Sequence, residues 1–215
     1  MRVLRWIGIA LGGLVLLVAL SFFLVERFDR VASNREVAMV RHGFARQVEE
    51  LDTVIATQVD WDDAVLNLDR NFSPEWADFN VGNYLHTFNG FSHAFVVDSG
   101  NRAIYASVDG ERAAIENFAP FAATTAKLVP QIRLAERKRP PLGPRPGKNN
   151  IAVPAIQANT VARIGGEAYL VTATLVQPDF GKILPKQPQA PITITALPLN
   201  QAFLDAFAGR YMQIG

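Results

Sequence analysis

The hydrophobic and polar positions divide the chain into an apolar segment, a helical segment and a region of strands. The segment Trp6–Val25 contains 20 residues without a charge. A helix of that length reaches about 30 Å, which is the thickness of the hydrocarbon core of a bilayer. The apolar region of a cleaved signal peptide is shorter, at about 7–15 residues. The pattern therefore predicts an uncleaved transmembrane helix.

The charges beside this helix predict its orientation. Arg2 and Arg5 precede it, whereas residues 26–30 carry two acidic and two basic residues. Because basic residues stay on the cytoplasmic side of a membrane, we expect residues 1–5 in the cytoplasm. The remainder is expected outside the inner membrane, in the periplasm if the cell is a Gram-negative bacterium.

Residues 26–58 have the period of one long stalk helix. The segment has no proline, and its apolar residues recur at steps of three or four, which places them on one helix face. The stripe consists of Val37, Val40, Phe44, Val48, Leu51, Ile55 and Val59. It fits packing on the chain's own domain, pairing of two stalk helices, or both in succession. We expect a homodimer formed through the transmembrane and stalk helices.

The chain is acidic between residues 49 and 80. This stretch has nine acidic residues and one basic residue, and it contains two tryptophans, in Asp60-Trp61-Asp62-Asp63 and at Trp76. One interpretation is structural: Asp60 and Ser73 are N-caps of two short helices, and Pro74 occupies the first position of the second helix. The other is functional: the acids and nearby amide side chains line a pocket for a small polar ligand. Paired acids favour an amine or a metal cation as partner, but the stretch lacks the regular spacing of a calcium loop.

Strands replace helices after residue 90. Runs of β-forming residues predict a hairpin from residues 92–98 and 103–107, and a second hairpin from residues 160–164 and 168–176 with a Gly-Gly turn. Ile192–Ala196 predicts a fifth strand. In the second hairpin, alternation places two sets of side chains on opposite faces: Tyr169, Val171, Ala173 and Leu175 on one, Leu170, Thr172 and Thr174 on the other.

The segment between the hairpins predicts a helix over residues 111–139, interrupted near Pro120 and Pro130 and followed by a proline-rich loop. Residues 133–148 contain six basic residues and one acid. This run fits an anion site, contact with lipid headgroups or, most simply, solvated charges. Asn200 is expected to cap a last helix.

These elements predict an α+β fold. A transmembrane helix continues into a long helix and is followed by a five-stranded antiparallel sheet with helices on one side. The expected divisions are a cytoplasmic tail (1–5), a transmembrane helix (6–25), a stalk helix (26–58) and an extracytoplasmic domain (59–211, or about 37–211 with the upper stalk).

Composition excludes several kinds of site. The net charge is +1, so the domain is not expected to bind nucleic acid through its overall field. The chain has no cysteine, which excludes disulfides, thiol nucleophiles and thiolate metal ligands. Three scattered histidines do not indicate a zinc site. We therefore predict no metal and no cofactor.

Several short motifs resemble the CHASE4 family of extracytoplasmic sensor domains. They are Trp61-Asp62-Asp63 near the end of a long helix, Trp76 with Asn80, a strand ending in Asp-x-Gly at Val96–Gly100, Ile104-Tyr105, and Phe203-Leu204. The likeness spans about residues 37–211. It implies a PAS-like or Cache-like sensor fold that usually lies between two membrane spans. A cytoplasmic diguanylate cyclase, cyclic-di-GMP phosphodiesterase or histidine kinase usually follows. No family-wide ligand is implied.

The chain departs from this pattern because its sequence contains neither a second span nor an output domain. We favour a fragment of a longer receptor over a short protein that signals through a partner. In the leading hypothesis the chain is a sensor input domain whose ligand-binding residues are Trp61, Asp62, Asp63, Trp76, Asn83, Phe95, Tyr105 and Tyr169.

Two alternatives belong to other functional classes. An anchored enzyme would use two of Asp60, Asp62 and Asp63 as acid and base. No nucleophile triad, metal motif or phosphate loop supports this, so we expect no catalytic activity in the chain. A single-pass envelope scaffold would bind a partner protein without a small ligand, and it would show an exposed apolar patch.

Overall fold

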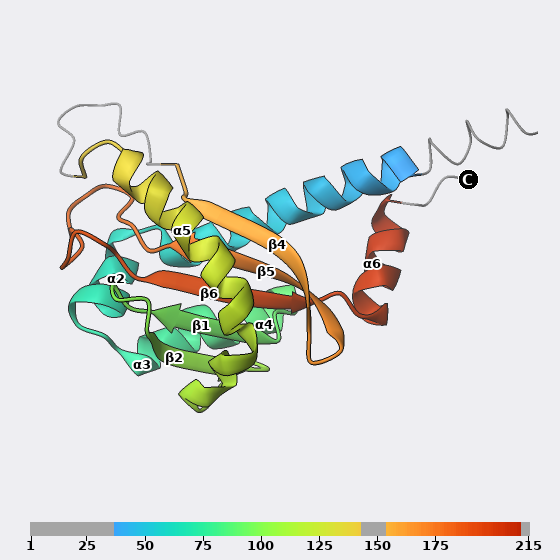
Figure 1. Cartoon of the computed structure of the whole chain (residues 1–215), viewed down its shortest axis with the longest axis horizontal. Coiled ribbons are helices and arrows are strands. Elements are labelled where there is room, and N and C mark those ends of the chain that lie inside the picture. The colour runs from blue at the N-terminus through green and yellow to red at the C-terminus, as the bar shows by residue number, and fades with distance from the viewer. Residues whose placement is uncertain (1–36, 143–153, 212–215) are drawn as a thin grey trace, which may run out of the picture. The chain divides into compact units, whose positions relative to one another are not determined.

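The computed structural model describes residues 37–142 and 154–211 (Figure 1). The predicted tail, the transmembrane helix and the first part of the stalk lie outside these residues. Within the described ranges, no helix is both long enough and apolar enough to cross a membrane. Residues 48–207 form one compact unit, and the described residues 37–47 and 208–211 belong to another. In the latter, Arg210 Nη1 donates to Gln47 Oε1 over 3.4 Å.

The sheet has six antiparallel strands in the order β3-β2-β1-β6-β5-β4. The five predicted strands are confirmed as β1 (His93–Val97), β2 (Ala103–Val108), β4 (Gln157–Ile164), β5 (Glu167–Leu175) and β6 (Ile192–Pro198). The prediction of five strands was wrong by one, because β3 (Glu111–Arg112) pairs with β2 where a helix was expected to begin. Asp109 and Gly110 both have positive φ, which permits the two-residue turn between β2 and β3.

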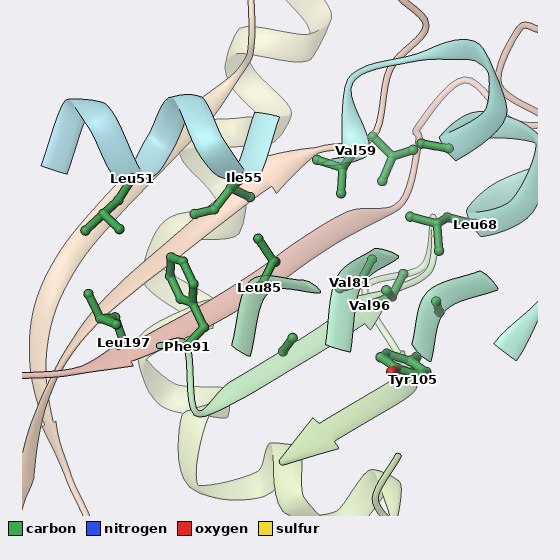
Figure 2. Close-up of a cluster of buried hydrophobic side chains, with 14 of the residues drawn as sticks. Leu51, Ile55, Val59, Leu68, Val81, Leu85, Phe91, Val96, Tyr105 and Leu197 are labelled. Carbon is green, nitrogen blue, oxygen red and sulfur yellow. The ribbon is translucent and has the colours of Figure 1, made fainter. Parts of the chain in front are cut away.

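Helices cover both faces of this sheet, which corrects the prediction that they lie on one side. One face is covered by helical residues 48–59 and by a series of short helices (Figures 1 and 2). The series consists of α2 (Asp62–Val65), η1 (Leu66–Arg70), α3 (Pro74–Ala77), η2 (Asp78–Asn83) and α4 (Tyr84–Asn89). The other face is covered by η3 (Ile115–Phe121) and α5 (Ala122–Lys138), which crosses the strands in Figure 1. The physical reason is that the central strands are buried along almost their whole length, so each face needs a cover.

Two apolar clusters fill the space between the sheet and its helices. The cluster on the first-helix face includes Leu51, Ile55, Leu85, Val96 and Leu197, drawn in Figure 2. The cluster on the α5 face includes Phe95, Phe121, Leu128, Ile132, Val171 and Ile194. The predicted alternation along residues 168–176 is confirmed, because Leu170 belongs to the first cluster and Val171 to the second.

The predicted helix boundaries are partly correct. Ser73 Oγ accepts from Trp76 N (3.2 Å), and Asn200 Oδ1 accepts from Phe203 N (3.0 Å), so both caps are confirmed; the latter precedes α6 (Gln201–Tyr211). The predicted cap at Asp60 is wrong. Residues 37–59 are helical, and Asp60 N still donates to Ala56 O (2.8 Å), so Asp60 ends the first helix instead of beginning α2.

The predicted breaks near the two prolines have different outcomes. A 3₁₀ helix containing Pro120 changes to the α-helix α5 after Phe121, which confirms the first break. The break at Pro130 is wrong, because α5 continues through it. Leu128 and Ile132 are buried on either side of Pro130, and this packing offsets the lost backbone hydrogen bond.

Candidate functional site

A carboxylate at the end of the first helix is joined to the segment after β5. Asp60 Oδ2 accepts from Gln177 Nε2 over 3.3 Å. Gln177 is completely buried, and its Nε2 also donates to Pro154 O over 2.9 Å. The other carboxylate oxygen, Asp60 Oδ1, is buried and has no hydrogen-bond partner within the described part of the chain. An unpaired buried acceptor of this kind can receive a hydrogen bond from a ligand.

Burial dominates the electrostatics of this carboxyl group. It raises the pKa of Asp60 from 3.8 to about 7. The hydrogen bond from Gln177 and the positive charge of Arg139 lower the pKa, whereas the negative charge of Asp179 raises it. At neutral pH the group is therefore divided between its protonated and ionised forms. A ligand that donates a hydrogen bond or carries positive charge stabilises the ionised form.

Other acids of the acidic stretch hold the proline-rich segment that follows β5. Asp62 Oδ1 accepts from Ile183 N (3.0 Å), and Asp62 N donates to Asp179 Oδ1 (3.2 Å). Asp69 Oδ2 accepts from Lys186 N over 2.6 Å. These bonds tie the segment to α2 and η1. Part of the acidity therefore has a structural role, although it differs from the helix capping that the first interpretation of the sequence predicted.

An ionic network from α5 borders the Asp60 site. The carboxylate of Glu136 lies 2.9 Å from Arg133 Nη1 and 3.6 Å from Arg139 Nη2, and it accepts from Ala190 N over 2.7 Å. Arg139 Nη1 also donates to Gln177 Oε1 over 3.5 Å. Two members of the predicted basic run are therefore engaged in internal contacts. Arg137 and Lys138 are exposed, as the solvated interpretation expects.

Three of the eight predicted ligand contacts lie near Asp60 or near one another. Trp61 and Asp62 follow Asp60 directly, and Trp76 contacts Trp61. The ring centroids of the two tryptophans are 5.9 Å apart, and Trp61 Nε1 donates to Gln58 O over 3.0 Å. Asp62 is bonded to the segment after β5, as described above. Asp63 and Asn83 are exposed.

The remaining three predicted contacts are distributed over both faces of the sheet. The Tyr105 hydroxyl donates to Asp78 Oδ1 (3.0 Å) on the first-helix face, where Arg112 contacts both oxygens of the same carboxylate. Phe95 and Tyr169 lie on the α5 face. The sheet thus separates these two rings from the tryptophans, and the structure does not gather the eight residues around one point.

Sequence reasoning did not select Gln177, Asp179 or Arg139 for this site. Gln177 and Asp179 lie in the segment after β5, and their hydrogen bonds to Asp60 and Asp62 each span 117 residues of chain. The helical period gave no signal for the burial of Asp60, because Asp60 is one residue after Val59 and five after Ile55, whereas residues three or four apart share a helix face.

Within the described ranges, no group of three or more His, Asp or Glu side chains is arranged to hold a metal ion. The family model for the CHASE4 domain matches residues 44–215. A search of curated proteins gives no match. The matched region contains the Trp-Asp-Asp motif, β1 with its Asp-x-Gly end, and α6, which are the features on which the sequence resemblance rested. The chain therefore belongs to the CHASE4 domain family, a family of sensor domains in signalling proteins.

Proposed function

We propose that the chain is the extracytoplasmic ligand-sensing input domain of a membrane-bound bacterial receptor. In this proposal residues 6–25 anchor it in the inner membrane, the domain is periplasmic, and a cyclic-di-GMP enzyme or histidine kinase forms the output. Family membership supports the general class, because CHASE4 is typically an extracellular domain and is sensory rather than catalytic. The receptor context, the ligand and a PAS-like or Cache-like mode of action belong to the proposal.

The observation that carries the proposal is the Asp60 carboxylate. It has an unpaired buried oxygen, and it lies at the end of the helix that follows the predicted anchor in the sequence. Gln177 connects it to the segment after β5. The ligand class that fits is a small molecule with a hydrogen-bond donor, and an amine fits best because the two nearby carboxylates, Asp60 and Asp179, outnumber the one nearby cation, Arg139.

Ligand binding at Asp60 offers a physical route to signalling. A donor on Asp60 Oδ1 stabilises the ionised carboxylate, which changes the balance of contacts between the first helix and the segment after β5. A ligand can shift a conformational equilibrium only through such a difference in affinity for two states. We propose that the two states differ in the position of the first helix and that a homodimer of stalk helices transmits the difference.

The proposal is tested by a thermal-shift screen of the full chain against amines, amino acids, organic acids, nucleotides and divalent cations. A ligand at 100 times its dissociation constant stabilises the native state by about 2.7 kcal/mol, which corresponds to roughly 5–11 °C for a chain of this size. We expect an amine to give such a shift in the native sequence and a much smaller one in Asp60→Asn.

Asp63→Asn is the matched control, because Asp63 is exposed and stands three residues away. It should keep the full shift. A ligand that stabilises native and Asp60→Asn chains equally would place the binding site elsewhere. A flat screen on folded protein would favour the second candidate function.

The second candidate is a single-pass envelope scaffold that binds a partner protein. One observation favours it: Phe79 and Phe88 are each 70% exposed, and the Phe88 ring lies 5.0 Å from that of Tyr84. Large apolar side chains left in water often mark interaction sites. This function predicts that Phe79→Ser with Phe88→Ser abolishes cross-linking to an envelope partner while the ligand screen stays flat. Cross-linking that survives both substitutions would argue against it.

A further inference from the structure

Four threonines form a block on the first-helix face of the sheet. Thr172 and Thr174 belong to β5 and pair in register with Thr195 and Thr193 of β6. All four are completely buried. We call these four residues the hydroxyl block.

The β5 half of the hydroxyl block has partners. Thr172 Oγ1 donates to Asp52 Oδ1 over 3.3 Å, and Thr174 Oγ1 accepts from Gln157 Nε2 over 3.0 Å. Asp52 Oδ2 also accepts from Asn159 Nδ2 over 2.8 Å. A network of side chains from the first helix, β4 and β5 therefore ends at this half of the block.

The β6 half of the hydroxyl block differs in its hydrogen bonding. The hydroxyl groups of Thr193 and Thr195 have no hydrogen-bond partner among residues 37–142 and 154–211. An unpaired buried hydroxyl destabilises a fold, and valine would fill the same space without it. The opposite face of β6 carries apolar side chains instead, from Ile192, Ile194 and Ala196. Two threonines in succession on this face therefore indicate a partner outside the described residues.

The spacing limits what that partner can be. Directly opposed residues on neighbouring strands have Cβ atoms about 5 Å apart, so one hydroxyl-sized group can bridge each β6 threonine to its β5 partner. Successive positions on one face of a strand are about 7 Å apart. Two bridging groups at that separation are therefore required.

The surroundings exclude a charged partner. The carboxylate of Asp52 repels anions, and its oxygens already accept from Thr172 and Asn159, so it does not require a cation. Much of the remainder of this face is apolar, with Ile55, Leu85 and Phe91 pointing toward one another in Figure 2. Of its other charged groups, Asp78 and Arg112 already contact each other.

We propose that the hydroxyl block is an internal binding site for two uncharged hydroxyl-type groups. They are supplied either by two ordered waters or by one small diol. The site is separate from Asp60 and does not depend on its role.

The test is the thermal unfolding of the full chain with Thr193→Val, Thr195→Val and both together. If the site is occupied, each substitution removes hydrogen bonds and should lower the melting temperature by about 2–4 °C. If the hydroxyls are simply unpaired, valine should raise the melting temperature or leave it unchanged, and the proposal is overturned.

Thr125→Val is the matched control. Thr125 Oγ1 on α5 is also buried and unpaired, but it does not belong to the block. This substitution should raise the melting temperature, which shows how an isolated unpaired hydroxyl behaves in the same chain.

Two further measurements identify the source of the groups and apply even if the double variant does not fold. Stabilisation of the native chain by 1,4-butanediol beyond that by 1-butanol, absent in the single valine variants, would identify a diol site. Magnetisation transfer from long-lived water to the methyl groups of Thr193 and Thr195 would identify the waters. Absence of both effects would overturn the proposal.

Discussion

Replacing Asp60 with asparagine should change how the stability of the protein depends on pH. Burial raises the pKa of Asp60 to about 7 in the folded state, against 3.8 in the unfolded state. The folded state therefore binds the proton more tightly. The resulting stabilisation is fully present below pH 3.8 and is lost as the pH rises through about 7. Asparagine resembles the protonated acid in shape and lacks this titration.

The size of the effect follows from the two pKa values. Between pH 5 and pH 8 the unfolded carboxyl stays ionised while the folded one loses its proton at about pH 7. This interval corresponds to about two pKa units, or roughly 2.7 kcal/mol at 1.36 kcal/mol per unit. For a chain of this size that is about 5–11 °C in melting temperature.

The assay is thermal unfolding of the native chain and of Asp60→Asn at intervals from pH 5 to pH 8. The measured quantity is the melting temperature of the variant minus that of the native chain, because other titrating groups contribute equally to both. We expect this difference to grow in favour of the variant as the pH rises. Asp63→Asn, at an exposed position three residues away, is the control for the substitution itself.

Two results would refute the reasoning. A difference for Asp60→Asn that does not change between pH 5 and pH 8 would mean that the carboxyl group titrates alike in the folded and unfolded states. A variant less stable than the native chain at pH 8 would mean that ionised Asp60 is held by a favourable partner, for which Arg139 is the nearby cation.

Two further substitutions test the packing of the two faces of the sheet. Gly82→Ala places a Cβ atom 2.6 Å from the Tyr105 hydroxyl and should destabilise the fold by about 1–3 kcal/mol in urea unfolding. Gly209→Ala, which meets nothing within 4 Å, should not destabilise it, and equal losses would contradict the steric argument. Arg133→Met leaves the Glu136 carboxylate, only 5% exposed, without its closest cation and should cost about 3–5 kcal/mol. Adding Glu136→Gln should recover part of this loss in the same assay, and a further loss would show that the charge was not the cause.

The candidate site was only partly accessible to prediction. The acidic stretch and its tryptophans directed attention to the right segment, because such a composition is unusual in a short piece of chain. Asp60 was interpreted as a cap, since a polar residue before Asp62 and Asp63 has the pattern of a helix start. Its partner Gln177 could not be identified, because the contact depends on where the segment after β5 lies.

The local pattern by itself determined the strands, the hairpins, two helix caps and the family of this protein. These features depend on neighbours in the chain: alternation selects a strand, Gly165-Gly166 permits a tight turn, and Ser73 caps the residues that follow it.

Only the tertiary structure decided that helices cover both faces, that a short sixth strand joins the edge, and which polar groups lack partners. The unpaired oxygens of Asp60, Thr193 and Thr195 are properties of an assembled interior. The Asp60 carboxyl group, for example, is paired by Gln177 across 117 residues of chain, and periodicity along the chain carries no information about which distant segments meet.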